Sequence, residues 1–225
     1  RIHRAIDDGE RIAVFGDYDV DGVTATALLY TYLDSAGADV YYKLPSRDDD
    51  GYGLSETAVD LMAAKGVSLI VTVDNGVSAN AAIAHAKEQG VDVVVTDHHL
   101  PPQTLPEAAA IVNPQLPGDE SPCKTLSGAG VAFKLAAALD GCTPDEMLPF
   151  YGDLAAIGTI ADIMLLEGEN RRIVKAGLAL LQQTERPGIA ALIEACGLGG
   201  KELTAENVSF GLAPRLNAAG RMDSA

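Results

Sequence analysis

The chain has 225 residues, and 48% of them are hydrophobic, which is enough apolar material for one large α/β domain or a domain plus part of another. This composition excludes disordered and fibrous proteins, and no apolar run reaches the roughly 20 residues of a membrane-spanning helix. The net charge of −16 falls on residues 1–164, with 9 Lys and Arg against 25 Asp and Glu, whereas residues 165–225 carry 7 of each. Because proteins that bind nucleic acid through bulk charge are basic, a nucleic-acid partner here would need metal ions and a few placed arginines.

The first half of the chain alternates short β-branched runs with helical patterns. The predicted strands are residues 11–15, 39–44, 67–73, 91–96 and a short fifth at 110–113. The predicted helices between them are residues 22–37, 55–65 and 78–89, the last two with Ser55 and Ser78 as N-caps. This alternation predicts an α/β fold with a mainly parallel five-stranded sheet and helices on both faces.

The second half is mainly helical after a proline-rich connection. The predicted helices are residues 131–139, 146–165, 170–183, 188–196 and 204–212. We predict that residues 1–166 form the α/β domain and that residues 167–225 form a helical connector. The three cysteines are odd in number and widely spaced, which fits neither a disulfide framework nor a zinc site, so we expect reduced thiols and a cytoplasmic location. No signal peptide is visible, and because the chain begins without Met we expect further residues upstream.

Three aspartates directly follow the first strand. Asp17, Asp19 and Asp21 alternate with other residues between two glycines, at the turn into the first predicted helix. Carboxylates this close repel one another unless a cation lies between them, and their hard oxygens suit Mg²⁺ or Mn²⁺. A solvated acidic turn or a helix N-cap is the alternative interpretation. An EF-hand is excluded because its twelfth position, which requires Glu, is Leu28.

More acids and two histidines follow the third and fourth strands. Asp74 follows the third strand, and Asp97, His98 and His99 follow the fourth. Each group alone is commonly a turn, but the carboxyl ends of neighbouring strands lie only about 4.8 Å apart. If the first, third and fourth strands are neighbours, these side chains converge on one or two metal ions. Asp162 stands in an apolar helical segment, where the alternative interpretation is an Asp at a helix end. An unpaired acid is costly to bury there, which favours metal binding.

These groups belong to an ordered series of motifs that resembles the DHH phosphoesterase family, and within it the RecJ-type branch of single-strand-specific DNA exonucleases. The series comprises Asp17–Gly22, Pro45–Arg47, Gly51–Leu54, Val73–Gly76, Thr96–His99, Ser127–Ala132, Asp153–Asp162 and Ala213–Arg221. Other branches usually have a His ahead of the first Asp pair, where Phe15 stands here. The resemblance also implies that further domains follow this core.

The resemblance implies a site for Mn²⁺ or Mg²⁺ with two ions. It implies that one ion is held by Asp21, Asp74, His98 and Asp162 and that the second is held by Asp19, Asp74 and Asp17. Two such ions can activate water and neutralise charge on a phosphate. We expect His99 to contact the phosphate and Asp97 to orient a metal ligand.

Substrate contacts are predicted from the guanidinium chemistry and the resemblance together. We expect Arg47, Arg215 and Arg221 to bind phosphates and Tyr52 to stack on a base, although exposed arginines are commonly only solvated and Gly-Tyr-Gly can be a packed turn. Asn217, within the last motif, is also expected at the substrate. The backbone N–H groups of Ser127, Gly128 and Gly130, before a helix, could hold an anion.

The resemblance implies a metal-dependent exonuclease that removes nucleotides from the 5′ end of single-stranded DNA in repair and recombination. Two alternatives stay open: a phosphodiesterase for short oligonucleotides or cyclic dinucleotides, and an inactive replication scaffold, which would have lost ligands that this sequence keeps. We expect single-stranded DNA as the partner, no membrane association and a monomeric protein.

Overall fold

The computed structural model describes residues 1–45 and 53–222, with side chains as far as Ala219. Its centre is a fully parallel sheet in the order β2-β1-β3-β4-β5. The strands are β1 (Arg11–Phe15), β2 (Asp39–Lys43), β3 (Val67–Val73), β4 (Asp92–Thr96) and β5 (Ala110–Val112). The predicted strands are confirmed to within one residue at each end, and β1, β3 and β4 are neighbours as the metal-site prediction required.

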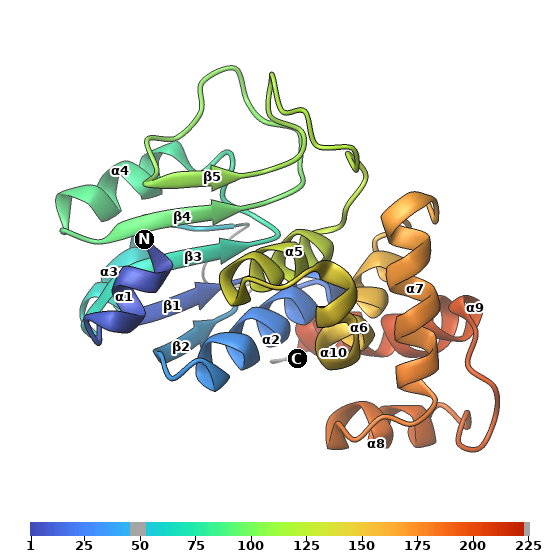
Figure 1. The fold of residues 1–225 in the computed structure, drawn as a ribbon. Helices are drawn as coiled ribbons and strands as arrows, with labels where there is room; N and C mark the ends of the chain where they lie inside the picture. The colour runs from blue at the N-terminus through green and yellow to red at the C-terminus, as the bar shows by residue number, and fades with distance from the viewer. Residues whose placement is uncertain (46–52, 223–225) are drawn as a thin grey trace.

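Helices cover both faces of the sheet (Figure 1). On one face lie α1 (Ile2–Asp7), α2 (Val20–Ser35), α5 (Gly128–Asp140) and α6 (Pro144–Ala161), and on the other lie α3 (Glu56–Ala63) and α4 (Asn80–Glu88). In β1 the buried side chains alternate, so that Ile12 and Val14 join the first core layer while Ala13 and Phe15 join the second. The period of two in the strand sequence therefore builds two cores, one on each side of the sheet.

The helices after residue 166 are α7 (Gly168–Leu181), α8 (Pro187–Ala195), α9 (Ala205–Asn207), the π-helical turn η1 (Val208–Leu212) and α10 (Ala213–Met222). Of these, α7 and η1 contact α6, while α9 and α10 contact η1. The apolar cluster of α2, α5 and α6 continues into them through Ile173, Val174 and Leu212. Contacts between α10 and α2 then bring the end of the described chain back to the first helix of the sheet layer.

Some predicted helix ends differ in the structure. Ser55 is the N-cap of α3, as predicted, and its Oγ accepts a hydrogen bond from the Ala58 N–H. Ser78 is not an N-cap, because α4 begins at Asn80 after Ala79. Neither α1 nor α10 was predicted, and the pattern at 204–212 is divided between a short helix and a π-helical turn.

Two features of the composition can be compared with the structure. Cys123, Cys142 and Cys196 are free thiols, as expected. In the part of the chain that the structure describes, no helix combines the length and the apolar character needed to cross a membrane.

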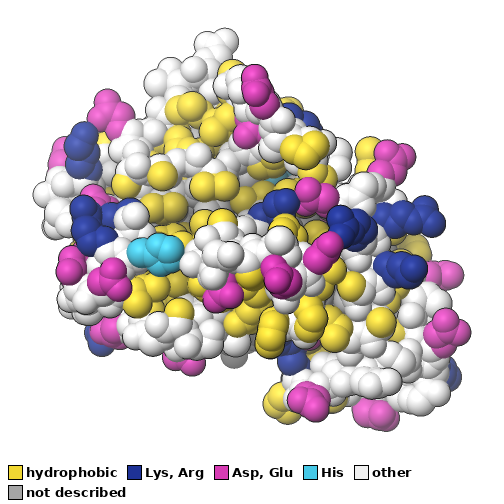
Figure 2. Space-filling view, viewed as in Figure 1, with side chains coloured by type: hydrophobic (Ala, Val, Ile, Leu, Met, Phe, Trp, Pro, Cys, Tyr) yellow, Lys and Arg dark blue, Asp and Glu magenta, His cyan; other side chains and the backbone are white. Residues whose placement is uncertain are grey.

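Figure 2 shows acidic and basic side chains interspersed over one face of the molecule, with apolar side chains between them.

Candidate metal centre

Four predicted ligands meet where the strand order reverses, beyond the carboxyl ends of β1, β3 and β4. Asp21 lies in the first turn of α2, Asp74 follows β3, and His98 lies just after β4. Asp162, the C-cap of α6, joins them from the other half of the chain. Parallel α/β sheets commonly bind their ligands at such a reversal, because the loops there diverge and leave space.

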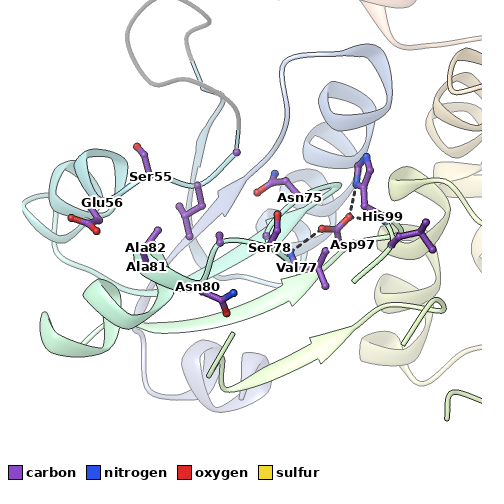
Figure 3. Close-up of a pocket in the computed structure, with 15 residues that line it drawn as sticks. Ser55, Glu56, Asn75, Val77, Ser78, Asn80, Ala81, Ala82, Asp97 and His99 are labelled. Atoms are coloured by element: carbon purple, nitrogen blue, oxygen red, sulfur yellow. Dashed lines mark hydrogen bonds and ion pairs between the residues drawn. The ribbon is translucent and has the colours of Figure 1, made fainter. Parts of the chain in front are cut away.

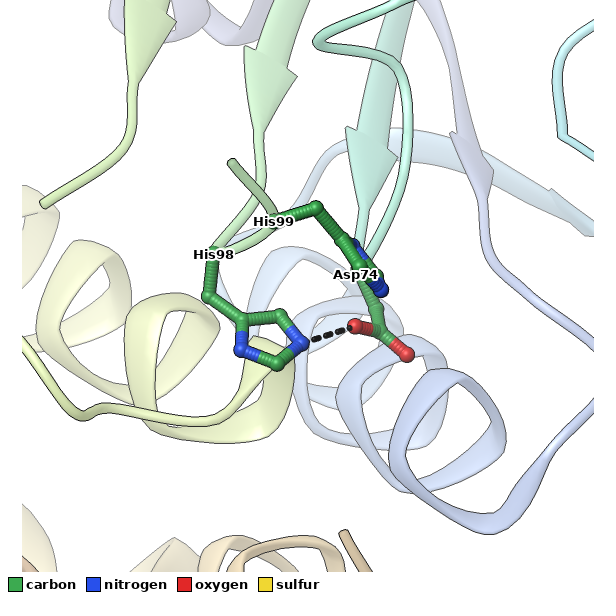
Figure 4. A group of neighbouring side chains, drawn as sticks. All are labelled: Asp74, His98 and His99. Atoms are coloured by element: carbon green, nitrogen blue, oxygen red, sulfur yellow. Dashed lines mark ion pairs between the residues drawn. The ribbon is translucent and has the colours of Figure 1, made fainter. Parts of the chain in front are cut away.

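The distances define one compact cluster. His98 Nε2 lies 3.0 Å from Asp74 Oδ1, 3.7 Å from Asp162 Oδ2 and 3.8 Å from Asp21 Oδ2. Figure 4 shows the His98 imidazole turned toward the Asp74 carboxylate. Two sets of three ligand atoms fall within 4.8 Å of one another: Asp21 with His98 and Asp162, and Asp74 with His98 and His99.

The electrostatics of the cluster favour a cation. Burial, and then repulsion from Asp162 and Asp19, raise the pKa of Asp21 to about 7. Burial and the neighbouring carboxylates also hold the pKa of Asp74 well above its usual value, and burial raises that of Asp162 to about 6. Burial lowers the pKa of His98 to about 4, so its imidazole is neutral near pH 7 and cannot balance these acids.

Unpaired oxygens in the cluster support the same conclusion. Asp74 Oδ1 and Asp162 Oδ2 are buried without a hydrogen-bond partner among the described residues. The 3.0 Å contact from His98 to Asp74 is close but is not aligned as a hydrogen bond. Buried carboxylate oxygens beside a neutral imidazole nitrogen form a donor set that fits a divalent cation.

Asp21 is held at the N-terminus of α5. Its two carboxylate oxygens accept hydrogen bonds from the N–H groups of Gly128, at 2.6 Å, and Ala129, at 2.9 Å. The Gly130 N–H donates to Ser127 Oγ at 3.1 Å. The sequence predicted an anion at the N–H groups of Ser127, Gly128 and Gly130, all of which are buried. Of these three, Gly128 holds the chain's own Asp21 carboxylate, and a substrate contact at this segment stays a prediction.

Glycines allow the elements around Asp21 to approach closely. A Cβ atom at Gly128 would overlap the side chain of Asp74, and one at Gly158, in α6, would overlap the Asp21 carboxylate and lie 2.6 Å from the Cβ of Ala129. The carboxylates of α2 and β3 can therefore meet the ends of α5 and α6 only because no side chains stand at these two positions.

Asp74 sits in a strained turn that is fixed by its neighbours. Its φ of 62° lies in the left-handed region, which is uncommon outside glycine. The following Asn75 donates from Nδ2 to the backbone oxygens of Val73, at 2.9 Å, and Phe15, at 3.4 Å, which ties the end of β3 to the end of β1. Such strain persists where the surroundings hold it, and here it directs the Asp74 carboxylate into the cluster.

His99 is held beside the cluster by Asp97. Its Nδ1 donates to Asp97 Oδ1 at 2.7 Å, and this bond raises the pKa of His99 despite partial burial. Burial alone would raise the pKa of Asp97, but the bonds from His99 and from the Val77 N–H outweigh it and leave that pKa low. Asp97 therefore orients a half-exposed imidazole whose pKa is raised.

A cavity of about 560 Å³ opens next to this pair (Figure 3). Its walls come from the N-terminal ends of α3 and α4, including Ser55, Ser78 and Asn80, and it ends at Asp97 and His99. Sequence reasoning did not predict this space, because it depends on the separation of two helices that the sequence does not set. A cavity of this size can hold a small ligand.

The remaining acids lie at the edge of the cluster. Asp19 is the N-cap of α2 and accepts from the Gly22 N–H at 2.9 Å. Asp17 is buried and accepts from the Tyr18 N–H at 2.6 Å. Among the described residues, neither belongs to a set of three converging ligand atoms, so their part in a second metal site stays a prediction.

Of the predicted substrate residues near the end of the chain, the structure describes the side chains of Asn217 and Arg215. Asn217 Oδ1 accepts from the Val20 N–H at 3.1 Å, so this side chain anchors the start of α2, and its substrate contact stays a prediction. Arg215 is exposed on α10 and donates to the Gly211 carbonyl at 2.8 Å. Arg47 and Tyr52 lie outside the described residues, as does the side chain of Arg221.

Comparison with known proteins identifies the class first. The sequence pattern of the "DHH family, N-terminal domain" matches residues 11–159, and the chain belongs to this family. Among curated proteins, the chain is 48% identical over 225 residues to the single-stranded-DNA-specific exonuclease RecJ of Bacillus subtilis, covering 100% of this chain and 28% of that protein. It is 44% identical over 235 residues to RecJ of Escherichia coli, covering 99% of this chain and 41% of that protein.

Solved structures of RecJ proteins are similar to this chain in fold. The crystal structure of an exonuclease RecJ bound to manganese matches 99% of this chain and 56% of that chain, with 41% identity and a TM-score of 0.87. RecJ of Thermus thermophilus in complex with Mn²⁺ matches 98% of this chain and 32% of that chain, with 39% identity and a TM-score of 0.82. The chain thus spans 28% and 41% of the length of the two curated relatives described above.

Proposed function

We propose that this chain carries the phosphodiesterase site of a metal-dependent, RecJ-type exonuclease that removes nucleotides from the 5′ end of single-stranded DNA in repair and recombination. The observation that carries the proposal is the convergence of Asp21, Asp74, His98 and Asp162, with two buried carboxylate oxygens unpaired among the described residues. Identities of 48% and 44% to RecJ proteins over nearly the whole chain support the substrate class.

We propose that Mn²⁺ or Mg²⁺ occupies this cluster and that Asp17 and Asp19 help to hold a second ion. Bound ions of this kind supply an activated water and neutralise charge on the phosphate under attack. The chain's own residues hold the ion and direct the substrate: Asp97 orients His99, whose protonated ring can donate to a phosphate oxygen. The cavity beside His99 would receive the nucleotide next to the cleaved bond.

Arg47, Arg215 and Arg221 remain proposed phosphate contacts, and Tyr52 a proposed stacking residue. We also retain as proposals the division into an α/β domain of residues 1–166 and a helical connector of residues 167–225. Single-stranded DNA as the partner, a monomeric state and a cytoplasmic location stay predictions.

The test is a nuclease assay with the full-length protein and single strands labelled at either the 5′ or the 3′ end, with Mn²⁺ or Mg²⁺. We expect the 5′ label to be released first as a mononucleotide from long strands, with Asp74→Ala as the inactive control. Release of the 3′ label first would contradict the polarity, and cleavage limited to short oligonucleotides would favour the alternative substrate class.

A further inference from the structure

Asn170 is a fully buried polar residue in the first turn of α7. Its Nδ2 donates two hydrogen bonds, to the backbone oxygen of Thr125 at 2.6 Å and to that of Leu165 at 3.0 Å. Its Oδ1 is buried with no partner among the described residues. An unpaired buried acceptor costs free energy. We therefore attribute the role of this side chain to its two donated hydrogen bonds.

The first bond leads to Asp21. Thr125 lies three residues before Gly128, the first residue of α5. At the start of this helix two backbone N–H groups hold the Asp21 carboxylate. Anchoring the Thr125 carbonyl therefore fixes the backbone that orients Asp21.

The second bond leads to Asp162. Leu165 lies three residues beyond this ligand, and between them Ile163 has a φ of 57° and is 86% exposed. A left-handed conformation is strained for a β-branched residue and persists only where its flanks are held. One flank is held by the bond from the Met164 N–H to the Thr159 carbonyl at 3.2 Å, and the other by Asn170.

We propose that Asn170 is a positioning residue that joins the two backbone segments on either side of the metal centre and thereby sets the spacing of Asp21 and Asp162. This inference rests on the proposed function only for the identity of the ion. Mg²⁺ requires near-ideal octahedral geometry, so loosening these segments weakens Mg²⁺ more than Mn²⁺ and shifts the metal preference. Residues that orient metal ligands typically change metal affinity by about 10- to 100-fold when replaced.

The matched control is Gln182, the C-cap of the same helix. Its side-chain amide also bridges two backbone groups, donating to the Lys201 carbonyl at 2.7 Å and accepting from the Leu203 N–H at 2.8 Å. It lies 12 residues, or about 18 Å along the helix, from Asn170. Loss of its bonds tests the stability of the connector without touching the segments at the metal centre.

The experiment measures Mn²⁺ and Mg²⁺ dissociation constants by calorimetry, and melting temperatures, for the full-length protein and its Asn170→Leu and Gln182→Leu variants. We expect both variants to melt earlier, but only Asn170→Leu to bind Mn²⁺ about tenfold more weakly and Mg²⁺ more weakly still. If that variant does not fold, Asn170→Ser, whose hydroxyl is too short to reach both carbonyls, is measured in the same way.

Unchanged affinities in the Asn170 variant, or equal losses in the Gln182 variant, would overturn the proposal and leave Asn170 a packing residue. The proposed function fails differently, since it would be contradicted by a wild-type protein that binds metal but does not cleave DNA. The two failures are therefore distinguishable in one set of samples.

Discussion

Replacing Asp21 with Asn should change how the stability of the metal-free protein depends on pH. Burial raises the folded-state pKa of Asp21 to about 7, from an ordinary value of 3.8. A raised carboxyl pKa means that the folded protein holds the proton more tightly, so the stability from Asp21 is present at low pH and is lost as the pH rises from 3.8 to about 7. The shift corresponds to about 4 kcal/mol in total, of which about 3 kcal/mol is lost between about pH 4.5 and about pH 8.

The contribution of His98 to stability changes with pH in the opposite direction to that of Asp21. The effect of Asp21 is therefore measured as a difference in stability between the wild type and Asp21→Asn. The pKa of His98 is lowered to about 4, so its contribution is present above the ordinary value of 6.5 and is lost as the pH falls toward 4. Both proteins keep His98, and its effect largely cancels when the free energy of unfolding of the wild type is subtracted from that of Asp21→Asn. The exposed Asp34, on the same helix, supplies the control Asp34→Asn.

The assay is urea unfolding followed by circular dichroism, in chelator, at several pH values. We expect the Asp21→Asn variant to gain about 3 kcal/mol relative to the wild type from about pH 4.5 to about pH 8, and Asp34→Asn to gain nothing. Saturating Mn²⁺ should make the wild type more stable than Asp21→Asn at high pH, because only the wild type keeps the full ligand set. A difference that stays constant with pH would refute the view that Asp21 is a buried, uncompensated acid.

Three further predictions follow from the site. Asp74→Ala, His98→Ala and Asp162→Ala should each abolish cleavage while leaving the fold largely intact, and undiminished turnover by a purified, folded variant would remove that residue from the site. We expect weaker DNA binding with a smaller salt dependence, and unchanged metal affinity, in the variants Arg47→Ala, Arg215→Ala and Arg221→Ala. Titration of labelled strands at several salt concentrations measures the DNA affinity and its salt dependence. An unchanged salt dependence would mean that the replaced arginine is a solvent-exposed charge with no phosphate contact. Gly158→Ala should cost about 1–3 kcal/mol in unfolding experiments, because its Cβ would overlap Asp21 and Ala129, whereas Gly188→Ala, where a Cβ meets open space, should not; equal stabilities would mean that α6 shifts freely.

The sequence predicted the sheet well because its signals are local. β-branched runs such as Val67–Val73 mark buried parallel strands without reference to the rest of the chain. The acids and histidines at the ends of three strands then predicted a common site on the condition that β1, β3 and β4 are neighbours, and this strand order is confirmed. The individual metal roles of these residues stay predictions.

Long-range contacts explain what the sequence could not show. The sequence predicted an anion at the start of α5, and the N–H groups of Gly128 and Ala129 there hold Asp21, more than 100 residues earlier in the chain. Asn217 was expected at the substrate, and its partner is the N–H of Val20, at the far end of the sequence. In both cases the residue type indicated a hydrogen-bonding role correctly, while only the fold determines which group is bound.

The most direct test of the metal centre is the anomalous scattering of crystals of the full-length protein grown with Mn²⁺. We predict an ion in direct contact with Asp21, Asp74, His98 and Asp162, and its loss in crystals of Asp74→Ala. Manganese bound elsewhere, with these four side chains coordinating nothing, would contradict the account.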